Sequence, residues 1–230
     1  ENTGAIRQKF RVNRLFLRRA FPIFVGKIRD GVRICASARK TLPMKNKDIF
    51  TFRDAEKQVG PVAFTTMLKP AGSTCNLDCH YCYYLDKAVQ YGGRQAVMSD
   101  ELLERYIRQY IEANQVDTVQ FCWHGGEPLL LGIDFYRKAM ELQQKYADGK
   151  RIENTLQTNG TLVDEAWCDL FAGNNFLVGI SLDGPQEIHD AFRVTKGGKP
   201  TFERVMQTVS MFRHGGVEYN TLSVVNRLCE

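Results

Sequence analysis

Three cysteines lie within eight positions of the stretch STCNLDCHYCYYLD, which runs from residue 73 to residue 86. They are Cys75, Cys79 and Cys82, and the other four of the seven cysteines occur singly along the chain. An odd number of thiols at this close spacing is unfavourable for disulfide pairing. A tight group of thiolates is typical of a site for a soft metal or an iron–sulfur cluster.

The number of clustered thiols favours a reactive site over a structural one. A structural zinc site takes four protein ligands, whereas a site that does chemistry keeps one coordination position open. Three thiolates on a four-iron cluster would leave one iron free for a substrate or a cofactor. The alternative is a zinc site completed by His80, Cys168 or Cys229, although the sequence contains no second C-x-x-C and no H-x-x-x-H.

The elements that must position these thiols alternate regularly from residue 62 onward. Strands are expected over residues 62–69, 117–123, 151–158, 176–182 and 217–225. Amphipathic helices are expected over residues 99–115, 133–147, 164–173 and 201–216. Gly173 is expected to end the third helix and Thr201 to cap the fourth. This alternation predicts right-handed βαβ units and a parallel sheet, hence an α/β fold.

Each of the first four expected strands leads directly into polar or glycine-rich residues. The cysteines follow the first strand and HGGEP (124–128) follows the second, while QTNGT (157–161) and SLDGP (181–185) lie at the ends of the third and fourth. In parallel α/β folds, the loops after the carboxyl ends of the strands meet at one rim and carry the functional groups. The sequence therefore predicts one site built from four loops.

The cysteine group and the HGGEP segment together resemble the radical S-adenosylmethionine (SAM) superfamily. The shared features are the C-x-x-x-C-x-x-C spacing with an aromatic residue, Tyr81, before the last cysteine, and Gly125-Gly126-Glu127-Pro128 after a strand. The resemblance implies that the three thiolates hold a [4Fe–4S] cluster whose fourth iron is chelated by the methionine part of SAM. It also implies that one electron from the cluster cleaves SAM to methionine and a 5′-deoxyadenosyl radical, which the protein must orient and shield.

Four segments resemble more closely the anaerobic sulfatase-maturating enzymes, which oxidise an active-site Cys or Ser of a sulfatase to Cα-formylglycine. They are CNLDCHYCYY, HGGEP, LQTNGTLVDEAW and FLVGISLDGPQEIHDAFR. The resemblance covers roughly residues 62–228 and implies a partial (β/α)6 radical SAM barrel, truncated after about the fifth strand. The expected domain is residues 44–230, incomplete at its C-terminus.

The resemblance further implies roles for individual residues. Cys75, Cys79 and Cys82 would be the cluster ligands. The residues expected to bind SAM are Tyr81 through its backbone, Gly125 and Gly126 beside the methionine amino group, Glu127 as a negative charge near that group, and Ser181 and Arg193 at the ribose or carboxylate. Glycines would let the backbone come close to the ligand. Tyr84 and His124 are expected to face the peptide substrate, although some family members have Gln at the position of His124.

Other parts of the family's machinery are expected beyond Glu230. That region carries two auxiliary [4Fe–4S] clusters and the Asp proposed as the catalytic base, so the sequence assigns no base within this chain. We therefore expect that the chain alone does not complete formylglycine formation. The implied partners are a sulfatase polypeptide and an electron donor of the flavodoxin or ferredoxin type.

The formal charge of +5 is unevenly distributed. Residues 1–43 contain eleven Lys and Arg against two acids, a net charge of +9, which leaves −4 for the rest of the chain. Two interpretations of this basic N-terminal extension stand side by side. It is an arm that binds nucleic acid or an anionic membrane surface, or it is non-native upstream sequence translated in frame before a natural start at Met44.

Composition sets the class of protein and leaves alternatives open. Unpaired cysteines without a secretory signal predict a cytoplasmic protein, and the apolar stretches are too short to span a bilayer. With the maturase interpretation we expect neither a nucleic-acid nor a membrane partner. Three alternatives remain: another peptide-modifying radical SAM enzyme that forms thioether or carbon–carbon crosslinks, a zinc-stabilised binding module, and the product of a broken reading frame.

Overall fold

The computed structural model describes residues 63–85, 87 and 97–229 of the 230-residue chain. The interpretations of residues 1–43 therefore lie outside the described residues. Within the described part, five strands form one sheet in which every neighbouring pair is parallel, in the order β1-β2-β3-β4-β5. The strands are β1 (Thr66–Leu68), β2 (Thr118–Trp123), β3 (Arg151–Thr158), β4 (Leu177–Ser181) and β5 (Glu218–Leu222). The predicted α/β fold with a parallel sheet is confirmed.

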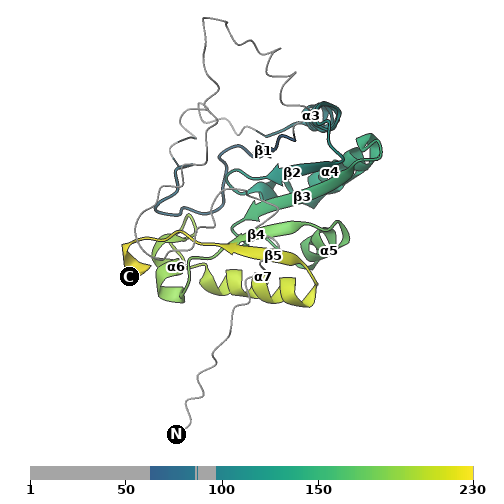
Figure 1. Cartoon of the computed structure of the whole chain (residues 1–230). Coiled ribbons are helices and arrows are strands. Elements are labelled where there is room, and N and C mark those ends of the chain that lie inside the picture. Colours follow the sequence, from purple (N-terminus) through teal and green to yellow (C-terminus); the bar gives the residue numbers. More distant parts are fainter. Residues whose placement is uncertain (1–62, 86, 88–96, 230) are drawn as a thin grey trace, which may run out of the picture. The chain divides into compact units, whose positions relative to one another are not determined.

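Helices connect consecutive strands and cover one face of the sheet (Figure 1). They are α3 (Asp100–Ala113), α4 (Ile133–Tyr146), α5 (Glu165–Gly173) and α7 (Phe202–His214). Sequential strand order with right-handed crossovers places all these helices on the same side, as in a barrel wall. The short helix α6 (Gln186–Phe192) instead lies beyond the carboxyl end of β4. No helix among the described residues is long and apolar enough to cross a membrane.

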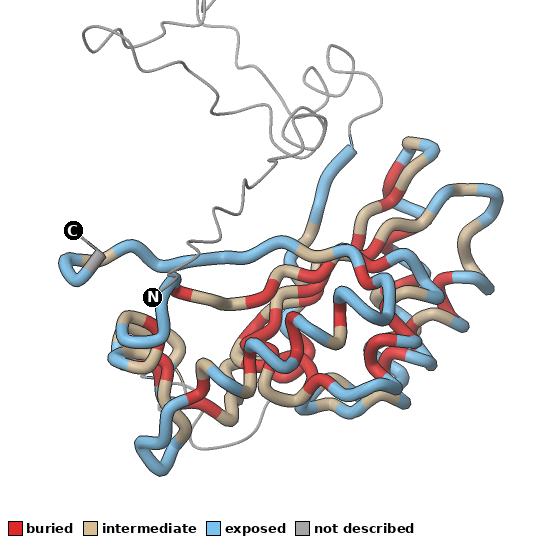
Figure 2. Tube along the Cα trace, turned by 90° about the horizontal axis from the view of Figure 1, so that it is seen from below, coloured by how far each residue is buried: buried red, intermediate tan, exposed pale blue. Residues whose placement is uncertain are grey.

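Burial alternates along the strands and shows which face carries the core. In β2, the side chains of Val119, Phe121 and Trp123 are buried, while the residues between them are half-buried. Figure 2 shows the buried residues gathered where the strands face the helices. Burying one such large apolar side chain contributes roughly 1.5–3 kcal/mol. The other face of the sheet is thereby left for polar and half-exposed groups.

Two predicted helix caps differ from the structure. Gly173 is the last residue of α5, as predicted, but it does not take the left-handed conformation of a residue that follows a helix, which Asn175 takes instead, with φ 51°. Thr201 precedes α7, but its side chain makes no capping hydrogen bond. The carboxylate of Asp190 instead accepts from the backbone N–H groups of Thr201 and Phe202, both at 2.9 Å. A cap supplied by another helix is invisible to a local sequence pattern.

The predicted first and last strands are longer than those observed. The structure assigns β1 to three residues within the predicted range 62–69, and β5 to five residues within 217–225. The connection after β2 also contains a 3₁₀ helix, η2 (Pro128–Leu131), and another, η3 (Arg227–Cys229), ends the described chain. These differences leave all five strand ends at the same rim.

Candidate active site

The loop after β1, residues 69–85, carries the three clustered cysteines and is fastened to the end of α6. The backbone N–H of Asp78 donates to the carbonyl of Val194 at 2.9 Å. The N–H of His80 donates to the carbonyl of Phe192 at 3.0 Å. These bonds hold a segment without regular secondary structure at the rim, because each satisfies a backbone group that would otherwise need water.

The HGGEP loop after β2 packs directly on the start of the cysteine loop. The N–H of Gly126 donates to the carbonyl of Gly72 at 3.0 Å, and the N–H of Glu127 donates to that of Thr74 at 2.8 Å. A Cβ atom added to Gly126 would lie 2.1 Å from the Thr74 carbonyl oxygen. The sequence analysis explained glycine at this position by the close approach of a ligand. In the structure, glycine is required because the backbone of the cysteine loop packs against Gly126.

Glu127 is fully buried, and its carboxylate links the β2 loop to the end of β3. One oxygen accepts from the Leu129 N–H at 3.0 Å and the Thr158 hydroxyl at 2.8 Å, and the other accepts from the Asn159 N–H at 2.8 Å. Burial raises the pKa of Glu127 to about 7. Its predicted place beside a cofactor amino group stays a prediction, since the contacts observed are all within the protein.

The loop after β3 reaches the first cysteine through Asn159. The amide nitrogen of this side chain donates to Asn76 Oδ1 at 2.9 Å and lies 3.7 Å from Cys75 Sγ. Its amide oxygen accepts from the N–H and the hydroxyl of Thr161, at 2.9 and 2.7 Å. Both ends of the Asn159 amide are therefore engaged, and one end faces a predicted cluster ligand.

The carboxylate of Asp183, after β4, accepts four hydrogen bonds at the rim. Its oxygens accept from Arg193 Nε at 2.9 Å, from Arg193 Nη2 at 3.0 Å and from the Val224 N–H at 2.9 Å. The Tyr81 hydroxyl also donates to it. Although burial alone raises the pKa of Asp183, hydrogen bonds from Arg193 and Tyr81 bring it below its usual value. This carboxylate thus ties the cysteine loop to α6 and to the segment after β5.

Ser181, at the end of β4, is bound from the neighbouring strand. The amide nitrogen of Gln157 donates to its hydroxyl at 3.0 Å. The Gln157 side chain crosses β4 at Gly179, where an added Cβ would lie 2.1 Å from the Gln157 amide oxygen. Glycine in β4 therefore makes room for the side chain that orients Ser181.

His124 and Tyr84 both lie near the ammonium group of Lys69. The Gly125 N–H donates to His124 Nδ1 at 2.8 Å, so the neutral imidazole carries its proton on Nε2. Burial, followed by the nearby charge of Lys69, lowers the pKa of His124. The Lys69 ammonium lies 5.1 Å from the centre of the Tyr84 ring. His124 is therefore held neutral with one N–H available as a donor.

These four loops enclose a cavity of about 500 Å³. Its lining includes ten of the eleven residues expected to bind the cluster, SAM or substrate, namely Cys75, Cys79, Tyr81, Cys82, Tyr84, His124, Gly125, Gly126, Ser181 and Arg193. The sequence did not assign roles to the other lining residues, which are Leu77, Tyr83, Gln157, Thr158, Asn159, Leu222, Ser223 and Val224. The expected convergence of separate motifs on one site is observed. Glu127, the eleventh residue, is buried and does not line the cavity.

The donor set at this cavity fits an iron–sulfur cluster. All three cysteines are free thiols. Burial raises the pKa of Cys75 and raises that of Cys79 to about 11, so their thiolates need a positively charged partner such as iron. Among the described residues, no three or more His, Cys, Asp or Glu side chains converge as a single metal ion would require.

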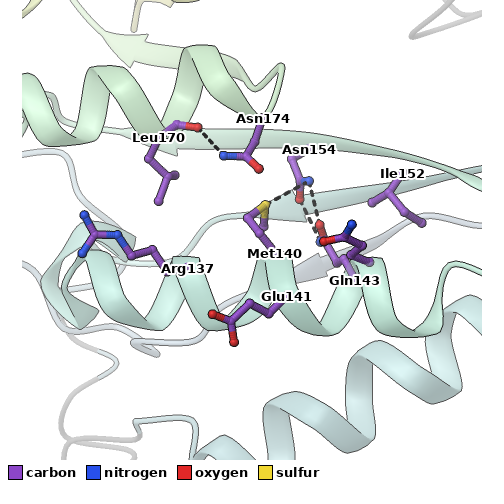
Figure 3. A pocket seen from close by; sticks show the side chains of 9 residues that line it. Arg137, Met140, Glu141, Gln143, Ile152, Asn154, Leu170 and Asn174 are labelled. Atoms are coloured by element: carbon purple, nitrogen blue, oxygen red, sulfur yellow. Dashed lines mark hydrogen bonds between the residues drawn. The ribbon is translucent and has the colours of Figure 1, made fainter.

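A separate hollow of about 580 Å³ lies on the helix side, between α4, β3 and α5 (Figure 3). Its deepest polar groups are paired with each other: Asn154 and Gln143 exchange two amide hydrogen bonds, at 2.9 and 3.0 Å. Asn154 also accepts from the Trp123 indole at 2.8 Å. Paired amides of this kind stabilise the core, and the hollow brings together no group of residues that could do chemistry.

The family model that matches this chain is the radical SAM superfamily, over residues 70–227. The chain belongs to the radical SAM superfamily. It is 54% identical over 161 residues to the serine-type anaerobic sulfatase-maturating enzyme of Bacteroides thetaiotaomicron, covering 70% of this chain and 39% of that protein. It is 43% identical over 162 residues to a cysteine-type anaerobic sulfatase-maturating enzyme of Clostridium perfringens, covering 69% and 43%.

Solved structures agree with the fold and with the assignment to this superfamily. The structure of native anSMEcpe with bound AdoMet and the Cp18Cys peptide matches with a TM-score of 0.66 and 40% identity, over 71% of this chain and 44% of that one. The radical SAM barrel predicted from the sequence is thus confirmed for the described part. The chain spans about two fifths of the length of the curated relatives that it matches.

Three residues of the site were underestimated from sequence. Gln157 and Asn159 were noted only as polar residues at the end of a strand, and Asp183 lies in a local SLDGP pattern that also suits a turn. Their partners are 24, 84 and 10 residues away, at Ser181, Cys75 and Arg193. Only the position at a strand end pointed to them.

Proposed function

We propose that this chain forms the cluster- and SAM-binding part of an anaerobic sulfatase-maturating enzyme. The observation that carries the proposal is the convergence of three free thiols, the GGEP loop, Ser181 and Arg193 on one cavity, in a chain 54% identical to a serine-type maturase. The proposed reaction is the oxidation of a Cys or Ser side chain in a sulfatase polypeptide to formylglycine. When bound, the reduced cluster would supply one electron to cleave SAM and produce a 5′-deoxyadenosyl radical.

Within this proposal, Cys75, Cys79 and Cys82 are the cluster ligands. Their loop is held before any cluster binds, through its backbone bonds to the end of α6 and to the HGGEP loop. A ligand set that is already positioned loses less conformational freedom on binding. No other cysteine lines the cavity among the described residues, so the fourth coordination position is left for SAM.

The proposed SAM contacts surround the thiols. Gly126 presents its carbonyl to the cofactor's amino group, and Tyr81 contributes backbone groups. Arg193 uses two of its nitrogens on Asp183, which leaves Nη1 to bind a carboxylate or ribose oxygen. Ser181 is oriented for the same cofactor by Gln157. Because Arg193 is buried and paired, its guanidinium is placed in advance rather than ordered by the ligand.

The substrate side of the cavity is proposed to be the wall of Tyr84 and His124. His124 accepts from Gly125 at Nδ1, so its Nε2–H can donate to an oxygen of the bound peptide. Its lowered pKa keeps it neutral at the pH of the cell interior. A cationic His124 would have to break the Gly125 bond, since the protonated Nδ1 cannot accept.

Further parts of the proposed enzyme concern the whole protein. We infer that auxiliary [4Fe–4S] clusters, the catalytic base and the site for a flavodoxin- or ferredoxin-type donor belong to the part of the relatives that this chain does not match. The two maturases compared above are matched over only 39% and 43% of their length, which leaves room for such additional parts. The free thiols of the described residues suit a reducing cytoplasm.

The test uses the full 230-residue chain, reconstituted anaerobically with iron and sulfide. It is mixed with SAM, a chemical reductant and a sulfatase peptide that carries Ser or Cys deuterated at Cβ. The proposal predicts 5′-deoxyadenosine that contains deuterium, detected by mass spectrometry, and none from a Cys79→Ala variant. Deuterium transfer from neither peptide, with SAM still cleaved, would contradict the proposal that this part of the enzyme places a sulfatase peptide beside the radical.

A further inference from the structure

Asn159 places a hydrogen-bond donor beside one of the three cysteines. Its amide nitrogen lies 3.7 Å from Cys75 Sγ, within the range for hydrogen bonds to sulfur. Asn159 is only 8% exposed, so water competes little for this contact. The backbone N–H of Leu77 donates to the same sulfur at 3.4 Å. Cys75 thus has two donors from different segments of the protein.

The orientation of the Asn159 amide is fixed by its neighbours. Its oxygen accepts twice from Thr161, through the backbone N–H at 2.9 Å and the hydroxyl at 2.7 Å. The amide nitrogen must therefore face Asn76 Oδ1 and Cys75. If the amide were flipped, its NH₂ group would face the N–H and the hydroxyl of Thr161, which are themselves donors. Asn76 in turn donates to the Thr161 hydroxyl at 2.8 Å, which closes the ring of side chains.

We propose that Asn159 sets the reduction potential of the cluster held by Cys75, Cys79 and Cys82, through its N–H bond to the Cys75 sulfur. Hydrogen bonds to cluster sulfurs stabilise the form with more negative charge, which is the reduced form. Removal of this donor therefore makes the cluster harder to reduce. The inference rests on the proposed function, since it requires the cluster at these thiols. Asn159 acts through Cys75 and is a positioning residue for the electron transfer.

The test compares midpoint potentials of the reconstituted full-length chain, measured by redox titration and electron paramagnetic resonance. Asn159→Leu keeps a similar volume and removes the donor. We expect the reduction equilibrium constant to fall about tenfold, which for one electron is about 59 mV toward more negative potential. In resonance Raman spectra, the Fe–S(Cys) stretch should move to higher frequency, because the sulfur that has lost its hydrogen bond binds iron more strongly.

Thr161→Val is the matched control. It removes a hydroxyl from the same ring of side chains, but the Thr161 N–H still holds the Asn159 amide, and no hydrogen bond joins Thr161 to Cys75. A purely structural network predicts similar changes in both variants. The inference predicts that Thr161→Val shifts the potential less than about a quarter as much. If Asn159→Leu does not fold, Asn159→Ala answers the same question, because it also removes the donor and adds no charge beside the cluster.

The outcomes separate this inference from the function on which it rests. A lower potential in the Asn159 variant alone supports it. Equal shifts in both variants, or none in either, overturn it while leaving the cluster site intact. Failure of the unaltered chain to take up iron and sulfide overturns both the cluster site and the inference.

Discussion

The buried ion pair between Asp183 and Arg193 gives the sharpest prediction for stability. The perturbation is Asp183→Asn, which keeps the shape of the side chain and removes its charge. Asp183 and Arg193 have side chains that are 0% and 10% exposed. The new amide turns a donor toward Arg193, Tyr81 or Val224, all of which donate to Asp183. The variant therefore loses stability in two ways: the Arg193 cation is left buried without its anion, and the new amide N–H faces another hydrogen-bond donor.

The magnitude follows from this burial. Removal of one partner of a buried ion pair costs about 3–5 kcal/mol, because the remaining charge stays desolvated. Since whole domains are stable by about 5–15 kcal/mol, we expect a large fraction of the stability to be lost. The free energy of unfolding is measured by urea denaturation monitored by circular dichroism. The affinity for SAM should fall as well, because Arg193 loses the acceptor that orients it.

The chain supplies a control pair at the surface with the same closest N–O distance. Asp134 and Arg137 also meet at 2.9 Å, but their side chains are 91% and 57% exposed. Asp134→Asn should lower the free energy of unfolding by no more than about 1 kcal/mol, since water screens the pair. A loss for Asp183→Asn as small as that for Asp134→Asn would refute the reasoning from burial.

Three further predictions concern the HGGEP loop. Gly126→Ala should abolish cluster uptake, because the new Cβ would lie 2.1 Å from the Thr74 carbonyl oxygen, whereas Gly173→Ala, where nothing lies within 4 Å, should load normally. The pKa of Glu127 is about 7 against an ordinary 4.5, so the free energy of unfolding should fall by about 3 kcal/mol as the pH rises from 4.5 through 7. Glu127→Gln should remove most of this pH dependence in urea denaturation, and an unchanged dependence would contradict its origin in Glu127. His124→Phe should weaken peptide binding about tenfold because the Nε2–H donor is lost, whereas His124→Gln should bind the peptide normally because it keeps an N–H donor. Both affinities are measured by calorimetry, and equal losses in the two variants would exclude the donor role.

The sequence was sufficient to predict the parallel sheet and the rim at which the motifs converge. Hydrophobic alternation and the strand-to-helix spacing depend on local period, and so β3 was predicted with its observed bounds, 151–158. The cysteines were singled out by residue type and spacing, and the GGEP residues by their place after a strand together with the resemblance to the radical SAM superfamily. Their convergence followed from the rule that parallel strands end at one rim, and the cavity confirms it.

The contacts that organise the rim could not be predicted in the same way. The role of Asp183 depends on Arg193 and Tyr81 reaching it from α6 and from the cysteine loop. The Gly126 requirement comes from a carbonyl 52 residues earlier, at Thr74. Such pairs depend on side-chain direction and loop packing in three dimensions, and a single sequence carries no signal that connects them.

The central claim is that Cys75, Cys79 and Cys82 hold a cluster with one iron open to SAM. The most direct measurement is electron paramagnetic resonance of the reconstituted, reduced chain before and after addition of SAM, with iron counted on the same sample. The account predicts about four iron atoms per chain, a reduced [4Fe–4S] signal that changes when SAM binds, and loss of both in the variant with all three cysteines replaced by alanine. A chain that takes up zinc instead of iron, or a cluster signal that SAM leaves unchanged, would contradict the account.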